Sequence, residues 1–171
     1  MGGSITTRAP LVCTGPIAYR GQAAIRQDID NLKSAMAGVA IAEAFMPAVA
    51  PGGVGRNEYY GSEEEYLAAV GDAVREEYLA IVDAGFILQI DDPWLTEVHS
   101  QDPSLSAAER RRIAERSVEA INHAIRGIPA EKIRFHTCYG INEGPRVHDA
   151  PLKEIVDLIL KVNAGAYASK A

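Results

Sequence analysis

Cysteine is scarce in this sequence: among 171 residues, only Cys13 and Cys138 occur. Two cysteines are too few for the disulfide framework that stabilises many small secreted domains. The amino terminus also lacks the basic and then apolar layout of a signal peptide. Both observations favour a reducing, cytoplasmic location.

Positive charge and long apolar segments are missing as well. The net charge is -6, and the only basic run, residues 110–112, lies beside acidic residues, so no basic stripe could neutralise the phosphates of a nucleic acid. The most apolar run, residues 35–49, contains Glu43 and Pro47 and is too short to cross a bilayer. We therefore expect neither a nucleic-acid partner nor a membrane partner.

The composition that remains is ordinary for a globular protein, with 47% hydrophobic and 23% charged residues. A chain of this length can bury one hydrophobic core. No shift in composition marks an internal boundary, so residues 1–171 are interpreted as a single domain.

Short apolar runs alternate with helical patterns along the chain. Strands are predicted at residues 10–16, 39–49, 86–90, 132–138 and from 163, and helices at 22–36, 62–83, 106–127 and 151–161. Ser62 with Glu65, and Ser106 with Glu109, predict capping boxes at two helix starts. Apolar strands that alternate with helices imply an α/β protein with a parallel sheet. Two architectures fit: an open doubly wound sheet, or part of a (β/α)8 barrel with about four βα units.

Two potential metal ligands, His136 and Cys138, end the strand predicted at residues 132–138. Side chains two residues apart on a strand point to the same face, so the imidazole and the thiolate would project together while Thr137 turns away. Imidazole and thiolate are common zinc ligands, and this pair would supply half of a zinc site. A buried thiol and a core histidine would explain the same residues without a metal.

Gln89 and Asp91 form a second candidate site, where the third predicted strand ends. The two side chains share one face of the extended chain, and both architectures bind ligands at the carboxyl ends of their strands. Adjacent carboxylates are costly when buried and unpaired, which favours a function for Asp91. Asp92 can instead serve in an Asx-type turn.

The remaining candidates are weaker. His148 could reach the same mouth as His136, whereas His123 lies inside a predicted helix and fits surface or interhelix packing. Cys13 is interpreted as a core residue of the first strand. The loop at residues 56–60 could contact a substrate, or its tyrosines could pack against the following helix.

Several motifs together resemble a known family. They are Thr14-Gly-Pro16, Ala73-Val-Arg-Glu76, Ala84-Gly85, Gln89-Ile-Asp-Asp-Pro93 and His136-Thr-Cys-Tyr139. In this order and spacing they resemble the C-terminal catalytic domain of cobalamin-independent methionine synthase. The stretch at residues 136–152 looks closer to short single-barrel members of that group, which include zinc alkyltransferases that act on coenzyme M.

The resemblance implies a (β/α)8 barrel of the TIM type, of which this chain would form a part. It implies zinc bound by His136 and Cys138, with further ligands on later strands. It also implies that Asp91, with Gln89 beside it, contacts the substrate, because Asp91 matches the carboxylate that holds the substrate's amino group. Asp92 departs from the family pattern, which has glutamate there.

The reaction implied is zinc-dependent transfer of a methyl group from a methylated folate to the thiol of homocysteine, which yields methionine. The alternatives are alkyl transfer to another thiol such as coenzyme M, and an inactive truncated remnant or a subunit that completes a barrel. A half-barrel has two open sheet edges and an uncovered core. A homodimer or a complementing half-barrel is therefore expected as a partner, beside the small-molecule thiol and methyl donor.

Overall fold

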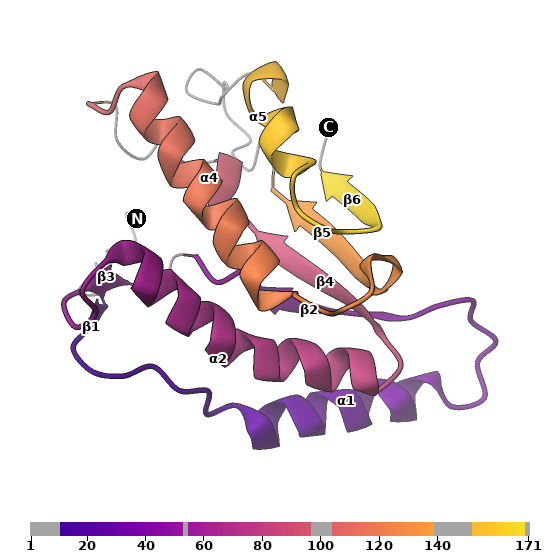
Figure 1. Ribbon diagram of the computed structural model, residues 1–171. Helices are drawn as coiled ribbons and strands as arrows, with labels where there is room; N and C mark the ends of the chain where they lie inside the picture. Colours follow the sequence, from indigo (N-terminus) through magenta and orange to yellow (C-terminus); the bar gives the residue numbers. More distant parts are fainter. Residues whose placement is uncertain (1–10, 53–54, 97–103, 139–151, 170–171) are drawn as a thin grey trace, which may run out of the picture.

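The computed structural model describes residues 11–52, 55–96, 104–138 and 152–169, and its centre is a four-stranded parallel sheet (Figure 1). The strands are β2 (Phe45–Val49), β4 (Ile87–Asp92), β5 (Ile133–Thr137) and β6 (Ala166–Ser169), in the order β2-β4-β5-β6. All three neighbouring pairs are parallel. The α/β class with alternating strands and helices is thereby confirmed.

Helices connect the strands of this sheet. They are α1 (Gln22–Met36), α2 (Glu63–Asp83), α4 (Ala107–Ala124) and α5 (Leu152–Ile159), with a 3-10 turn, η1 (Ala130–Lys132), before β5. The capping box of Ser106 and Glu109 is confirmed in both directions. At α2, Ser62 accepts from the Glu65 N–H as predicted, but the Glu65 carboxylate accepts from the backbone of Gly61 instead, so only half of that box forms.

One face of the sheet is covered by the helices, and burial alternates along the strands accordingly. Leu88, Ile90 and Phe135 are fully buried and belong to one core with residues of all four helices. The helix residues include Ile25, Ile29, Tyr78, Ile81, Val118, Ile121, Ile155 and Leu158. The core therefore lies between the sheet and this helix layer. Burial of each large apolar side chain there contributes about 1.5–3 kcal/mol to the stability of the fold.

The strand order follows the chain without reversal. A doubly wound sheet reverses its strand order and carries helices on both faces. The described part of this sheet shows no reversal of strand order, and its helices lie on one face. It is therefore singly wound, and the doubly wound alternative does not describe it. In such a sheet the carboxyl ends of consecutive strands meet along one edge, which brings the ends of β4 and β5 together.

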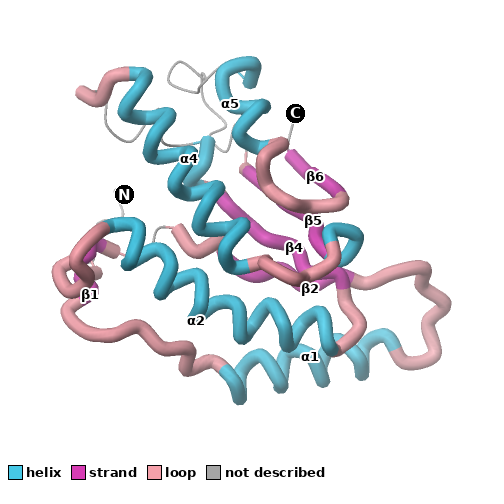
Figure 2. Tube along the Cα trace, in the orientation of Figure 1, coloured by secondary structure: helices cyan, strands magenta, loops and turns pink. Residues whose placement is uncertain are grey.

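The prediction for the first strand was wrong. Residues 10–16 were expected to form a buried strand of the sheet, yet only β1 (Val12–Cys13) forms, and it pairs with β3 (Arg56–Asn57) in a separate two-stranded ladder (Figure 2). Leu11 is 72% exposed. Gly55 explains the pairing, because a Cβ there would lie 2.6 Å from the Leu11 carbonyl oxygen; only glycine admits this approach, at a φ of 124°.

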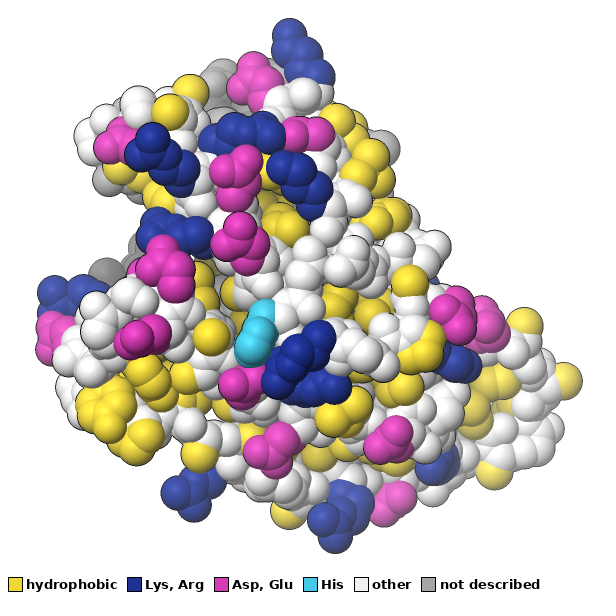
Figure 3. All heavy atoms as spheres, viewed as in Figure 1, with side chains coloured by type: hydrophobic (Ala, Val, Ile, Leu, Met, Phe, Trp, Pro, Cys, Tyr) yellow, Lys and Arg dark blue, Asp and Glu magenta, His cyan; other side chains and the backbone are white. Residues whose placement is uncertain are grey.

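The outer surface on the helix side carries a mixture of acidic and basic side chains, with apolar patches among them (Figure 3). Several of these charges are paired between helices, as for Arg111 with Asp157 and Arg116 with Glu64. Exposed pairs of this kind contribute little to stability. Within the described ranges, no helix has both the length and the apolar character that a bilayer crossing requires.

Candidate functional site

The face of the sheet opposite the helices is called the open face here, because the side chains on it are exposed or half-buried. It is defined by Phe45, Pro47 and Val49 of β2, Gln89 and Asp91 of β4, Arg134 and His136 of β5, and Ala166 and Ala168 of β6. Three of the four predicted site residues therefore share one surface, as the two-residue period of a strand requires.

Asp91 and His136 are direct neighbours on this face. The two residues are paired in register across β4 and β5, and His136 Nδ1 lies 2.9 Å from Asp91 Oδ1. The Nδ1 atom is buried, and the ring is not aligned for a hydrogen bond to any described atom. The two side chains are therefore close to each other without a hydrogen bond between them. The carboxylate occupies the Nδ1 side of the imidazole, which leaves Nε2 as the nitrogen available to a ligand.

Gln89 links this pair to Arg134. Its Nε2 donates to Asp91 Oδ1 at 2.8 Å, and its Oε1 accepts from Arg134 Nε at 2.6 Å. Both ends of the amide are thus engaged with groups of the correct polarity. The Arg134 guanidinium also stacks on the ring of Phe45, with its Cζ 3.7 Å from the ring centroid. A polar chain therefore runs along the open face from β2 to the ends of β4 and β5.

Cys138 follows directly after β5 and is half-buried. Its carbonyl oxygen accepts a hydrogen bond from Thr96 Oγ1, which fixes the backbone of the strand end. Thr137 is 1% exposed, lies on the helix side and donates to the carbonyl of Asp92, so its predicted orientation away from His136 is confirmed. Neither Cys138 nor Cys13 forms a disulfide.

The donor chemistry of His136 and Cys138 fits a zinc ion, since imidazole and thiolate are its preferred ligands. Asp91 stands on the side of His136 Nδ1 where metal-bound imidazoles commonly have a carboxylate as second partner. Two donors make half of a tetrahedral site. Among the described residues, no group of three His, Cys, Asp or Glu side chains comes close enough to hold a metal.

Asp92 has a structural role, in the Asx-type turn that the sequence analysis gave as an alternative to a functional role. Its side chain is 2% exposed and faces the helices, on the side opposite Asp91. Its Oδ1 accepts from the N–H groups of Trp94 and Leu95, at 2.8 and 3.1 Å, which is an Asx-type turn. Burial raises the pKa of this carboxyl, against the lowering effect of the two backbone hydrogen bonds.

The weaker candidates fall away from this site or outside the described residues. His123 contacts Asp72 of α2 at 2.8 Å, so the prediction of interhelix packing is confirmed. Cys13 is half-buried in the small ladder rather than in the core, which corrects its predicted place. Tyr60 packs near the ring of Tyr66 and accepts from a backbone N–H of the N-terminal segment. His148 lies outside the described residues.

Comparison with curated proteins adds an independent observation. A segment of 85 residues is 35% identical to a methionine synthase of Saccharolobus islandicus (strain L.S.2.15 / Lassen #1), and covers 49% of this chain and 22% of that protein. The methionine synthase of Saccharolobus solfataricus (strain ATCC 35092 / DSM 1617 / JCM 11322 / P2) is 34% identical over the same length. About half of this chain is therefore distantly similar to archaeal methionine synthases.

The similarity to methionine synthases is partial. The matched segment spans about a fifth of the length of these relatives, 22% in each. No family model matches the chain. The similarity covers about half of the chain, and the activity of the chain has to be argued from its site.

The sequence did not indicate Arg134 and Phe45 as members of this candidate site. Arg134 precedes His136 by two positions, so the strand period that paired His136 with Cys138 would also have placed Arg134 on the same face. Phe45 carries no sequence signal of this kind, because its contact with Arg134 reaches across β4.

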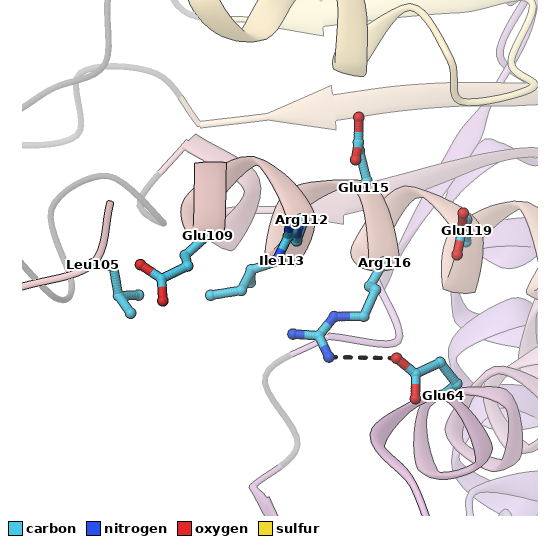
Figure 4. Close-up of a pocket in the computed structure, with 8 residues that line it drawn as sticks. All are labelled: Glu64, Leu105, Glu109, Arg112, Ile113, Glu115, Arg116 and Glu119. Atoms are coloured by element: carbon cyan, nitrogen blue, oxygen red, sulfur yellow. Dashed lines mark hydrogen bonds and ion pairs between the residues drawn. The ribbon is translucent and has the colours of Figure 1, made fainter. Parts of the chain in front are cut away.

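A separate groove of about 540 Å³ lies on the helix side, between the start of α2 and α4 (Figure 4). Acidic and basic side chains line it together, and Arg116 pairs with Glu64 across it at 3.4 Å. The lining residues are Glu64, Leu105, Glu109, Arg112, Ile113, Glu115, Arg116 and Glu119. None of these lining residues is a histidine or a cysteine, so the groove is not the predicted site.

Proposed function

We propose that this chain forms part of the catalytic domain of a zinc-dependent methyltransferase that moves a methyl group from a methylated folate to the thiol of homocysteine. The observation that carries the proposal is the pairing of Asp91 with His136 in register at adjacent strand ends, with Cys138 two residues further on. The partial similarity to methionine synthases supports the same chemistry.

His136 Nε2 and Cys138 Sγ would hold the zinc ion, since Asp91 occupies the other side of the imidazole. When bound, zinc makes a coordinated thiol lose its proton near neutral pH and become a nucleophile. Asp91 has a second task in the proposal. Its Oδ1 faces Gln89 and His136, and Oδ2 is left for the ammonium group of the substrate.

Gln89 acts in the proposal by positioning its neighbours, not by binding the substrate alone. Both ends of its amide are occupied, one by Asp91 and the other by Arg134. Because the carbonyl faces a cation and the NH₂ faces a carboxylate, reversing the amide would create two repulsive contacts. Gln89 therefore keeps the groups on either side of it in one arrangement.

The architecture we propose is part of a (β/α)8 barrel, in which the open face would line the interior. Three features support it: sequential parallel strands, helices on one face, and polar groups at the strand ends on the other. Parallel sheets are normally covered on both faces. Further strands, from a second copy or from a complementing half-barrel, would cover the open face and supply the remaining ligands.

The test combines metal content, mass in solution and thiol methylation. We expect the purified chain to bind zinc, and Cys138→Ser to lose it. Cys13→Ser is the matched control, because Cys13 lies in the β1–β3 ladder. Methyl transfer to homocysteine should depend on zinc and on Cys138 in the same way. Equal zinc content in the Cys138→Ser variant and the wild type, or methyl transfer that survives the loss of Cys138, would refute the proposal.

A further inference from the structure

The Arg134 guanidinium is held on two sides and open on a third. Phe45 covers one flat face, and Gln89 accepts from Nε. Within the described part of the chain, the two terminal nitrogens, Nη1 and Nη2, have no hydrogen-bond or ion-pair partner. These two atoms form the end of the planar fork that binds carboxylates and other oxyanions in a bidentate way.

Among the residues that the structure describes, no carboxylate forms an ion pair with Arg134. Asp91 lies one step further along β4, but Gln89 stands between the two groups and hydrogen-bonds to both. A half-buried cation without a counter-ion is costly, and a rigid one loses less entropy when it binds an anion. The stacking on Phe45 and the hydrogen bond to Gln89 supply that rigidity.

The open face thus presents a cation and a carboxylate on adjacent strands, separated by one amide. Asp91 Oδ2 and the Arg134 Nη atoms both lack described partners. An ammonium group fits the first, and an oxyanion fits the second. His136 lies beside Asp91 in register, so a thiol held by these charges would have its sulfur near the proposed metal ligands.

We propose that Arg134 binds an oxyanion carried by the substrate, so that the site selects small thiols with a carboxylate or a sulfonate group. The inference rests on the proposed function, because it assigns the substrate of that same site. It makes Arg134 a specificity-determining residue: homocysteine would place its carboxylate on Arg134 and its ammonium on Asp91. A thiol with a sulfonate and no ammonium would use Arg134 alone.

The test measures the affinity of three thiols for the full chain with one equivalent of zinc, by isothermal titration calorimetry. The thiols are L-homocysteine, its methyl ester, which has no anion, and 2-mercaptoethanesulfonate, which has no ammonium. The variants are Arg134→Gln, Arg134→Lys and the control Arg26→Gln. Arg26 is exposed on α1, so its loss removes one positive charge far from the site.

We expect Arg134→Gln to weaken homocysteine and the sulfonate by about 10- to 100-fold, the usual effect of charge-assisted hydrogen bonds. Binding of the methyl ester should not change, and Arg134→Lys, which keeps the charge, should fall between wild type and Arg134→Gln. Tighter binding of homocysteine than of the sulfonate would show that the ammonium is recognised too.

The inference is overturned if Arg134→Gln weakens all three thiols equally, since that indicates a packing role. It is also overturned if the wild type binds the ester as tightly as the acid, and the proposed function then still stands. Failure of the wild type to bind any of the three thiols would remove the proposed function and the inference together. Thermal unfolding of each variant establishes that it is folded before its affinity is compared.

Discussion

His136 Nδ1 lies 2.9 Å from Asp91 Oδ1, and the two residues face each other in register on neighbouring parallel strands. A register shift of one residue would turn one of the two side chains to the helix side. The pairing of β4 with β5 therefore determines whether this contact exists. The position of the imidazole is set by the sheet itself and does not depend on a loop.

The contact predicts an effect of Asp91 on metal binding. Asp91→Asn should lower the affinity for zinc by about 10- to 100-fold, because it removes the negative charge beside His136 Nδ1, and second partners of metal-bound imidazoles have effects of that size. Competition with a chromophoric chelator measures the change directly.

A matched control for this variant exists on the helix layer. Asp72 contacts His123 Nε2 at 2.8 Å, so Asp72→Asn removes the same chemical group from another histidine. Its zinc affinity should equal that of the wild type. An equal affinity for zinc in the Asp91→Asn variant would contradict the assigned role of Asp91.

Tyr78 connects α2 to the end of β2. Its ring is fully buried, and its hydroxyl donates to the Val49 carbonyl at 2.6 Å. Burial raises the pKa of Tyr78, so the hydroxyl stays protonated and remains a donor at neutral pH. Tyr78→Phe should lower the free energy of unfolding by about 0.5–1.5 kcal/mol, because the variant loses one hydrogen bond between α2 and β2.

Urea denaturation followed by circular dichroism measures this loss. Tyr59→Phe removes the same atom from a ring that is 52% exposed, and should leave the midpoint unchanged. If the two variants unfold at the same urea concentration, the Tyr78 hydrogen bond contributes nothing to stability.

Asp92 predicts a pH dependence of stability. Burial raises its pKa in the folded chain above the unfolded value of about 3.9, so the folded state retains the proton over a wider pH range. The contribution of protonated Asp92 to stability is complete below the unfolded pKa. This contribution is lost as the pH rises through the folded pKa. An asparagine at this position has no proton to lose, so Asp92→Asn should gain stability relative to the wild type as the pH rises above about 4.

Thermal unfolding of wild type and variant at several pH values tests this expectation. Asp30→Asn, at an exposed position on α1, reports the effect of removing one negative charge. A difference in unfolding temperature between wild type and Asp92→Asn that does not vary with pH would refute the prediction.

Gly165 allows β6 to join the sheet. Its N–H donates to the carbonyls of Ala130 and Ile133, and a Cβ at this position would lie 2.7 Å from the Ala130 oxygen. Gly165→Ala must displace backbone atoms and should cost roughly 1–3 kcal/mol, as overpacking does. At Gly15 an added Cβ meets nothing within 4 Å, so Gly15→Ala is the control. Equal unfolding midpoints for the two variants would exclude this clash.

The sequence predicted the parts of this structure that depend on local pattern. Period and capping residues placed the helix at Gln22–Met36 and the start at Ser106, and the two-residue period put His136 and Thr137 on opposite faces. The matching levels of Asp91 and His136 also followed, since both residues end apolar runs of parallel strands.

Contacts between distant segments were not predictable in this way. The pairing of β1 with β3 depends on a close backbone approach at Gly55, which no periodicity marks. The stacking of Arg134 on Phe45 depends on the width of one intervening strand. Both contacts are set by tertiary geometry, which local propensity does not encode.

The order β2-β4-β5-β6 has a consequence for how the sheet assembles. Each strand pairs with the strand made just before it in the sheet, over separations of roughly 30 to 45 residues, and the entropy of closing such loops rises only slowly with their length. Among the described strands, none has to insert between two that are already paired. The sheet can therefore grow by addition at a single edge during synthesis, each new strand docking on a completed one.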